Sequence, residues 1–501
     1  MKLLRIMCVV ALALSFVTSV YAGTQSVKIS GDLEVRGIFR DNYGIGNAPE
    51  GNARTGVTRS NQEWFMSTVE AQIDADLTDN VSAVVRLANM RDWNIYAKNI
   101  TVGPAATTIA TNGRYLGGGY TASDDEFDLL VDLAYIELKE FLYSPLTLKI
   151  GRQDMWFGKG FIVGLNQQDP NGNLAAPEYT TINSFDAIRA TLDYDPWTVD
   201  AVYSNIYGNT IQASDGVNLL GTNIGYIFDS YNAESEAYYW YKSDKQIAAA
   251  LQGNNDVHTI GLRGSADPIE FWTVGLEGAF QFGNSVATDL QIDARKRRAW
   301  GFDASVETRQ FADDFAWKPV ITAEYIYYSG DKHAADLDAE VQAGDVTTGI
   351  YASATPTKPA GSTVGTNTGW DPMLRGKFDT KYREFIGRYY ATTDYPVRPR
   401  MYQSTADASF TNQHQALLGL AVLPTDSLTA TGKLAFFWLD EDATNLRTKK
   451  YVGTEFDMHL VWDYTEDVSF GVLGAWFFPG NLYVDDENVA TDLMGSVKLS
   501  F

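Results

Sequence analysis

Cysteine is almost absent from this chain of 501 residues, and its one copy, Cys8, lies close to the N-terminus. A disulfide framework, a thiolate metal site and a cysteine nucleophile are therefore not expected. The four histidines, His258, His333, His414 and His459, are far apart and form no pair at metal-ligand spacing. A Gly-x-Ser-x-Gly elbow and a phosphate loop are also missing, so the sequence predicts neither an enzyme nor a cofactor or metal site.

Basic residues are scarce, with 39 Lys and Arg against 63 Asp and Glu. A surface with this balance repels the phosphate backbone, so no nucleic-acid partner is expected.

Long apolar runs occur only at the N-terminus. There, basic Lys2 and Arg5 precede an apolar stretch at 6–17, and Val20-Tyr21-Ala22 has the pattern of a cleavage site. These features predict a signal peptide at 1–22 and a mature domain at 23–501. Beyond it no apolar run reaches the roughly 18 residues of a membrane-spanning helix. A soluble secreted protein and a membrane β-barrel both satisfy that observation.

Polar and apolar residues alternate along several segments. In 27–40, Val27 and Leu33 belong to an apolar set at odd positions, while Lys28 and Asp32 belong to a polar set at even positions. Because successive side chains of a strand point to opposite faces, such a segment has one apolar and one ionic face. The same split recurs at 65–77, 270–282, 299–309, 427–439 and 456–463.

The connections between these segments alternate in length. Long loops on one rim and short turns on the other are typical of outer-membrane barrels, whereas a soluble sandwich gives no reason to separate them. The long polar stretches lie near 41–62, 93–125, 158–183, 283–297 and 330–406. The short turns are Thr78-Asp79-Asn80, Tyr143-Ser144-Pro145, Asp195-Pro196, Asp267-Pro268, Pro424-Thr425-Asp426 and Thr465-Glu466-Asp467.

The sequence therefore predicts an all-β fold: a transmembrane antiparallel barrel of about 18 strands, with short periplasmic turns and long extracellular loops. Closure is required because an open sheet edge in lipid leaves backbone groups unpaired. A lumen of this size is too wide for strand side chains to fill, so a water channel is expected. The last strand alternates up to a terminal aromatic residue, Phe501, which is typical of the signal read by the barrel-assembly machinery.

One region resembles a known family. The run LTLKIGRQDMWFGKGFIVG at 146–164 contains Gly151-Arg152-Gln153, and 185–204 contains Phe185-Asp186-Ala187-x-Arg189 followed by Trp197-x-Val199-Asp200. This pattern resembles the alginate-export family of outer-membrane porins. The resemblance implies a monomeric barrel that passes an anionic uronate polymer through an Arg-rich lumen. Two features depart from it: Tyr179 to Ser184 replaces the usual Trp and Arg before the Phe-Asp pair, and the lumen charge is mixed.

The candidate substrate-binding residues are basic and fall into two groups. Inward acidic residues are at least as numerous as the basic ones, so the sequence leaves the solute open between an anionic polymer and a neutral sugar. Arg383, Arg398 and Arg400 lie beside aromatic residues in the loop 330–406, which either caps the barrel or folds into its mouth. The strand candidates are Arg36, Arg86, Lys149, Arg152, Arg189, Arg263 and Arg309.

Arg152 has two interpretations. Its parity with Leu148 and Ile150 places it outward unless Gly151 forms a bulge that reverses the register. With a bulge it reaches the pore constriction. Without one it braces the outer rim through Asp154 or Asp186.

The sequence thus predicts a porin in the outer membrane of a Gram-negative-type bacterium. It would pass hydrophilic solutes, with anionic polysaccharide or oligosaccharide as one class. The alternative is a structural or adhesive barrel with a plugged lumen. Expected partners are outer-membrane lipid and lipopolysaccharide, the assembly machinery and the solute, and the barrel is expected to be a monomer.

Overall fold

The structure is a computed structural model that describes twelve stretches of the chain. Among the residues described, no helix has the length and apolar character needed to cross a bilayer. The predicted signal peptide lies outside the described residues, which are 26–42, 62–93, 129–142, 145–166, 182–207, 216–245, 255–285, 295–331, 366–382, 411–441, 450–481 and 488–501.

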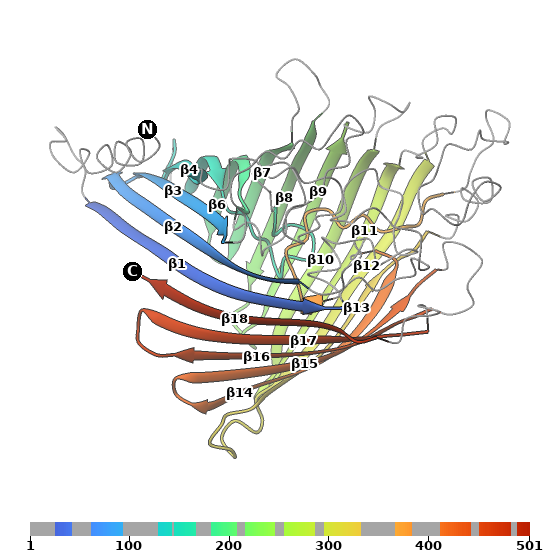
Figure 1. Cartoon of the computed structure of the whole chain (residues 1–501). Helices are drawn as coiled ribbons and strands as arrows, with labels where there is room; N and C mark the ends of the chain where they lie inside the picture. The colour runs from blue at the N-terminus through green and yellow to red at the C-terminus, as the bar shows by residue number, and fades with distance from the viewer. Residues whose placement is uncertain are drawn as a thin grey trace, which may run out of the picture.

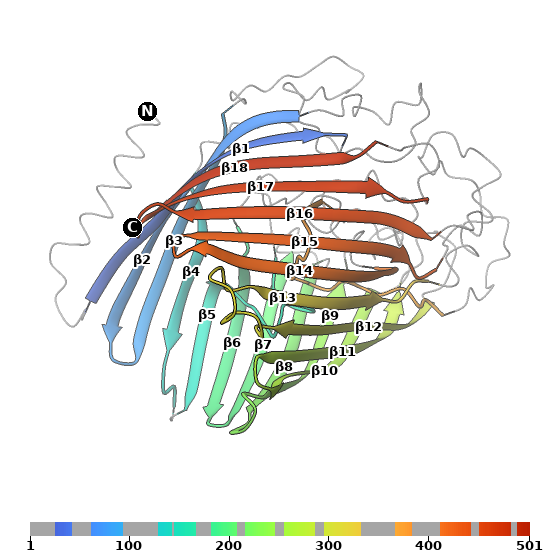
Figure 2. The same ribbon diagram turned by 90° about the horizontal axis from the view of Figure 1, so that it is seen from below.

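Eighteen antiparallel strands form one sheet, in which each strand pairs with its neighbours along the chain. β1 also pairs with β18, so the sheet closes on itself, and the first and last strands lie side by side in both views (Figures 1 and 2). The predicted barrel and its strand number are confirmed. The strands are β1 (Ser26–Asp41), β2 (Gln62–Thr78), β3 (Val81–Asp92), β4 (Leu130–Leu138), β5 (Leu146–Gln153), β6 (Phe185–Tyr194), β7 (Trp197–Tyr207), β8 (Val217–Ile227), β9 (Glu234–Asp244), β10 (Asn255–Ile269), β11 (Trp272–Ser285), β12 (Arg295–Thr308), β13 (Val320–Tyr328), β14 (Gln413–Thr425), β15 (Leu428–Leu439), β16 (Tyr451–Asp463), β17 (Val468–Pro479) and β18 (Ala490–Ser500).

The alternation in the sequence becomes the two faces of the wall. On β11, the outward Leu276 is 53% exposed, whereas the inward Glu277 beside it is 5% exposed. On β1, Val27 and Ile29 are likewise exposed on the outer face. Lipid covers this outer face in a membrane, while the polar set faces the lumen.

The connections also follow the predicted alternation of short and long. Two-residue turns such as Asp195-Pro196 and Asp426-Ser427 join strands at one rim. One predicted turn is displaced: Asp267 and Pro268 still belong to β10, which has a register shift there, and Glu270-Phe271 makes the turn.

Aromatic side chains gather at both rims of the outer face. At the short-turn rim, the ring centroids of Trp462 and Phe470 are 5.6 Å apart. At the opposite rim, the His258 ring stacks on Tyr241 at 4.6 Å and on Phe282 at 4.9 Å. Aromatic residues at these levels form the belts that fix a barrel at the two membrane interfaces.

Candidate functional site: the constricted lumen

Two connections fold into the barrel instead of staying at its rim. Residues 154–166 follow β5, and residues 366–382 lie between β13 and β14. Phe161 and Trp370, one from each segment, are buried with their ring centroids 5.9 Å apart, and Phe161 stacks at 5.5 Å on Tyr328 of the inner wall. The lumen is therefore partly filled at this level.

Backbone hydrogen bonds join the two segments. The Leu374 amide donates to the Ile162 carbonyl at 3.0 Å, and the Gly164 amide donates to the Leu374 carbonyl at 2.8 Å. A side chain on Gly164 would begin only 2.9 Å from the Cα of Gly376, so glycine permits this close approach. We call residues 154–166 and 366–382 together the lumen ledge.

Asp371 fastens the ledge to one part of the wall. Its carboxylate accepts a 2.5 Å hydrogen bond from Lys242 of β9, and both groups are buried. Its backbone exchanges two hydrogen bonds with the side chain of Gln281 on β11, at 2.7 and 2.8 Å. Burial acts to raise the pKa of Asp371, but the charges of Lys242 and Arg297 outweigh it and hold that pKa below its usual range.

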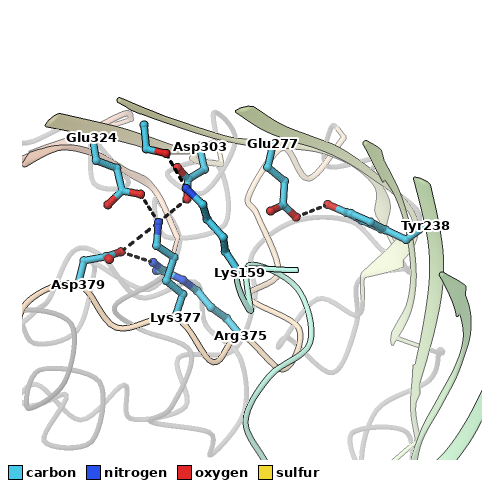
Figure 3. Close-up of polar contacts among 9 residues, drawn as sticks. Lys159, Tyr238, Glu277, Asp303, Glu324, Arg375, Lys377 and Asp379 are labelled. Atoms are coloured by element: carbon cyan, nitrogen blue, oxygen red, sulfur yellow. Dashed lines mark hydrogen bonds and ion pairs between the residues drawn. The ribbon is translucent and has the colours of Figure 1, made fainter. Parts of the chain in front are cut away.

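Lys377 fastens the ledge to a second part of the wall (Figure 3). Its ammonium donates to Asp303 of β12 at 2.5 Å and to Glu324 of β13, and it lies 3.6 Å from Asp379 of the ledge itself. Arg375 also contacts Asp379, at 3.3 Å. Three carboxylates therefore surround one ammonium that is almost withdrawn from water.

The charges of this anchor are stabilised by one another. Burial acts to lower the pKa of Lys377, but the carboxylates of Asp379 and Asp303 outweigh it and raise that pKa. Burial of Asp379 acts in the opposite sense, and the charges of Lys377 and Arg375 outweigh it and lower the Asp379 pKa. Both pKa shifts favour the charged forms of Lys377 and Asp379 while the ledge is anchored.

The ledge should loosen in acid. A carboxylate whose pKa is lowered stabilises the anchored state above its ordinary pKa of about 4, and this contribution is lost as the pH falls through the lowered value. Lys377, whose pKa is raised, contributes its full stabilisation of the ledge below about pH 10 and loses it only as the pH rises through the raised pKa. We expect a larger, noisier current in planar bilayers once the pH falls below the lowered pKa of Asp379 than at pH 7. An unchanged current down to the lowest pH at which the barrel stays folded would contradict the Asp379 anchor.

A cavity of about 480 Å³ lies beside the ledge. Lys159 and Lys377 of the ledge and Lys433 of β15 contribute to its lining. Thr273 and Thr322, which also line it, lie at the starts of β11 and β13, close to the short turns. The cavity thus extends from the ledge toward the short-turn rim.

Comparison with known proteins places the barrel in a family. The family model for alginate export matches residues 27–495. This chain belongs to the alginate export family. No curated protein matches this family member in sequence.

Solved outer-membrane porins are similar to this alginate export family member in fold. OccK11 (OpdR) of Pseudomonas aeruginosa is 10% identical, with a TM-score of 0.51 over 96% of this chain and 98% of the porin. OccK9 (OpdG) of the same organism is 13% identical, with a TM-score of 0.51 over 96% of this chain and 100% of the porin. A BenF-like porin from Pseudomonas fluorescens Pf-5 is 10% identical, with a TM-score of 0.50 over 96% and 100%. Its family and its closed barrel together make the chain a porin-like barrel of the Gram-negative outer membrane.

Four of the predicted basic residues on the inner face of this alginate export barrel form ion pairs with carboxylates. A mixed lumen was expected, and these contacts neutralise the four charges. Arg86 contacts Asp132 at 2.6 Å and Asp154 at 3.3 Å, Lys149 contacts Glu137 at 3.3 Å, Arg189 contacts Asp200 at 2.8 Å, and Arg263 contacts Glu234 at 2.6 Å and Glu236 at 2.5 Å.

Arg152 lies on the outward face. Pairing between β5 and β6 runs without a shift from Leu146 to Gln153, although Gly151 has a φ of 126°. Arg152 therefore keeps the parity of Ile150, and its guanidinium lies 3.8 Å from Asp186, which is 62% exposed. This is the rim brace, so the bulge that would have carried Arg152 into the lumen is not formed.

The remaining predicted residues lie apart from the ledge. Arg36 is buried on the inner wall, where it donates to Thr68 at 2.9 Å. Arg309 follows β12 at the short-turn rim, where its side chain is 56% exposed and contacts Glu307. Arg383, Arg398 and Arg400 lie outside the described residues.

The residues that build the ledge anchors were not among the predicted ones. Lys159, Arg375 and Lys377 lie on loops, where alternation gives no facing direction. Their one signal is position, because Lys159 falls in the quoted run 146–164 and Lys377 in the long loop 330–406. Within the described stretches, no group of three or more His, Cys, Asp or Glu side chains is placed to hold a metal ion.

Proposed function

We propose that this chain is an outer-membrane channel that passes small hydrophilic solutes through a lumen narrowed by the ledge. The observation that supports the proposal is the closed wall with a polar inner face, crossed by a ledge that is tied to β9, β11, β12 and β13. A ledge with this many attachments acts as a fixed size filter. We assign no enzymatic activity to the chain.

The second candidate is passage of an anionic polysaccharide. Membership of the alginate export family favours it. The paired charges count against it, because a polyanion needs basic groups that are not already neutralised. Arg86, Arg189 and Arg263 each contact a carboxylate on the wall.

Liposome swelling separates the two candidates. Proteoliposomes loaded with an impermeant polymer are diluted into isotonic glucose, maltose or an oligouronate of several residues. We expect fast swelling in glucose, slower swelling in maltose and none in the oligouronate. Fast entry of the oligouronate would support the polymer channel, and no swelling in any sugar would support a plugged structural barrel.

Two further parts of the proposal concern assembly. We propose that the barrel is a monomer and that the assembly machinery recognises β18 and the terminal Phe501. The Phe501 amide and carbonyl each form a 3.0 Å hydrogen bond with Gly31 of β1, so the chain end completes the seam between the first and last strands.

Reversing the charge of Arg189 tests the lumen assignment. Arg189 lies 4.9 Å above the Phe157 ring of the ledge, beside Asp200. Arg189→Glu places two carboxylates together at the constriction, so we expect the reversal potential in a KCl gradient to shift toward cation selectivity. Arg152→Glu makes the same charge change on the outer face and should leave the potential unchanged. Equal shifts in both variants would contradict the inward placement of Arg189.

A further inference from the structure

Hydroxyl groups, three lysines and three carboxylates contribute to the lining of the cavity beside the ledge. Of the carboxylates, Glu324 and Asp379 contact Lys377, and Glu307 contacts Arg309. Ser305, Thr322 and Thr431 supply hydroxyls from three different strands. Lys377 is surrounded by carboxylates, as described above, and its charge is neutralised. The other two lysines are placed differently.

Lys159 reaches from the ledge to the wall and meets a hydroxyl there. Its ammonium donates to Ser305 Oγ at 2.5 Å. A side chain at Gly275 would begin 3.0 Å from this ammonium, so the absence of one makes room for it. Among the residues that the structure describes, no carboxylate forms an ion pair with Lys159, and an ammonium has two further protons to donate.

Lys433 is held in a similar way on β15. Its ammonium donates to the backbone carbonyl of Asp379 at 3.0 Å, and within the described part of the chain it forms no direct ion pair with a carboxylate. Lys159 and Lys433 thus bring two positive charges without direct ion pairs into a cavity whose three carboxylates contact other basic groups.

We propose that this cavity is a binding subsite for an oxyanion group, with Lys159 and Lys433 as its charged donors. Ammonium groups with unused protons bind carboxylate or phosphate oxygens by short, charge-assisted hydrogen bonds. The surrounding hydroxyls suit a ligand that also carries hydroxyl groups. Solutes that bear one carboxylate or phosphate on a hydroxylated carbon skeleton fit this chemistry. The subsite rests on the proposed channel function, because such a solute reaches it through the lumen.

The subsite is expected to be more accessible from one side of the membrane than from the other. Thr273, Thr322 and Thr431 lie near the short-turn ends of their strands, and the ledge bounds the cavity from the other direction. An oxyanion therefore enters the subsite more readily from the short-turn, periplasmic rim.

Channel block by small oxyanions tests the proposal. Inorganic phosphate, and in a separate series glucose 6-phosphate or gluconate, is added to one side of a planar bilayer and then to the other. We expect block from one side only, with an inhibition constant that rises about tenfold in Lys159→Gln and Lys433→Gln, the loss of one charge-assisted hydrogen bond. Block by acetate would show that a carboxylate is sufficient, and stronger block by gluconate than by acetate would show that the hydroxyls contribute.

Lys318→Gln is the matched control, since Lys318 is exposed on the β12–β13 turn at the same rim and does not line the cavity. The anions should block the Lys318→Gln channel with the same inhibition constant as the wild type. The proposal is overturned if no anion blocks the open wild-type channel, or if Lys159→Gln and Lys433→Gln are blocked as strongly as Lys318→Gln.

A silent wild-type barrel would refute the channel without deciding the subsite. Titration calorimetry of phosphate into the detergent-solubilised wild type then decides it, because binding that weakens in Lys159→Gln supports the subsite and no measurable heat overturns it. If Lys159→Gln does not fold, as judged by heat-modifiable migration in gels, Ser305→Ala replaces it and should weaken binding severalfold.

Discussion

Replacing residues 366–382 by a Gly-Ser linker of equal length will raise the single-channel conductance severalfold. An 18-strand barrel encloses more space than its own side chains fill, so the ledge sets the narrowest cross-section. The Trp370 ring, the Asp371 carboxylate and the Lys377 ammonium are among the side chains that hold this half of the ledge in place. The linker lacks these side chains, so it is not held in the lumen. The measurement is the distribution of single-channel currents in planar bilayers with 1 M KCl.

The control is a matched replacement outside the lumen. Residues 311–317 form the turn between β12 and β13, and their aromatic members Phe311, Phe315 and Trp317 are exposed. A Gly-Ser replacement there should leave the conductance unchanged. If the 366–382 variant folds with the wild-type conductance, the ledge does not limit the flow.

Lys377→Met will destabilise the barrel and loosen the ledge. The substitution leaves Asp303, Glu324 and Asp379 close together without the ammonium that they share. Removing one partner of a buried ion pair costs about 3–5 kcal/mol. We expect a lower urea midpoint for unfolding in detergent and frequent transitions to a higher conductance.

Two variants separate charge from shape at this position. Lys377→Arg keeps the charge and should retain most of the stability. Lys377→Met combined with Asp303→Asn and Glu324→Gln removes the uncompensated carboxylates and should recover much of the loss. If Lys377→Met matches the wild type in both stability and current noise, Lys377 is not an anchor.

The barrel could be predicted from sequence because its physics is local. Side chains along a strand alternate between its two faces. A wall with lipid on one side and water on the other therefore requires apolar and polar residues to alternate in the sequence. Along 270–282 the alternation alone separates the outward Leu276 from the inward Glu277, with no knowledge of any other strand. Arg86 and Arg189, two of the strand candidates, face inward by the same alternation.

The ledge could not be predicted because its contacts join distant parts of the chain. Lys377 binds Asp303 and Glu324, which precede it by 74 and 53 residues. The sequence identified 330–406 as a long loop and left open whether it projects outward or folds inward. Loops have no periodicity that gives a side chain a direction, so only the three-dimensional structure brings Lys377 to the two carboxylates.

At Arg152 the two-residue period of β5 holds, although the glycine before it could have formed a bulge. Glycine at a positive φ often marks a bulge. At Gly151 both the φ of 126° and the lack of space require glycine, because a side chain would begin 2.3 Å from the Ala134 carbonyl oxygen. The pairing with β6 nevertheless has no shift there, so Arg152 stays on the rim with Asp186.

The most direct test of the central claim is the ionic current through the purified wild-type barrel in a planar bilayer. A continuous, ohmic conductance that is lower than that of the 366–382 replacement is the predicted result. A correctly folded barrel that carries no current in either form would contradict this, because ions and water would then not pass through its interior.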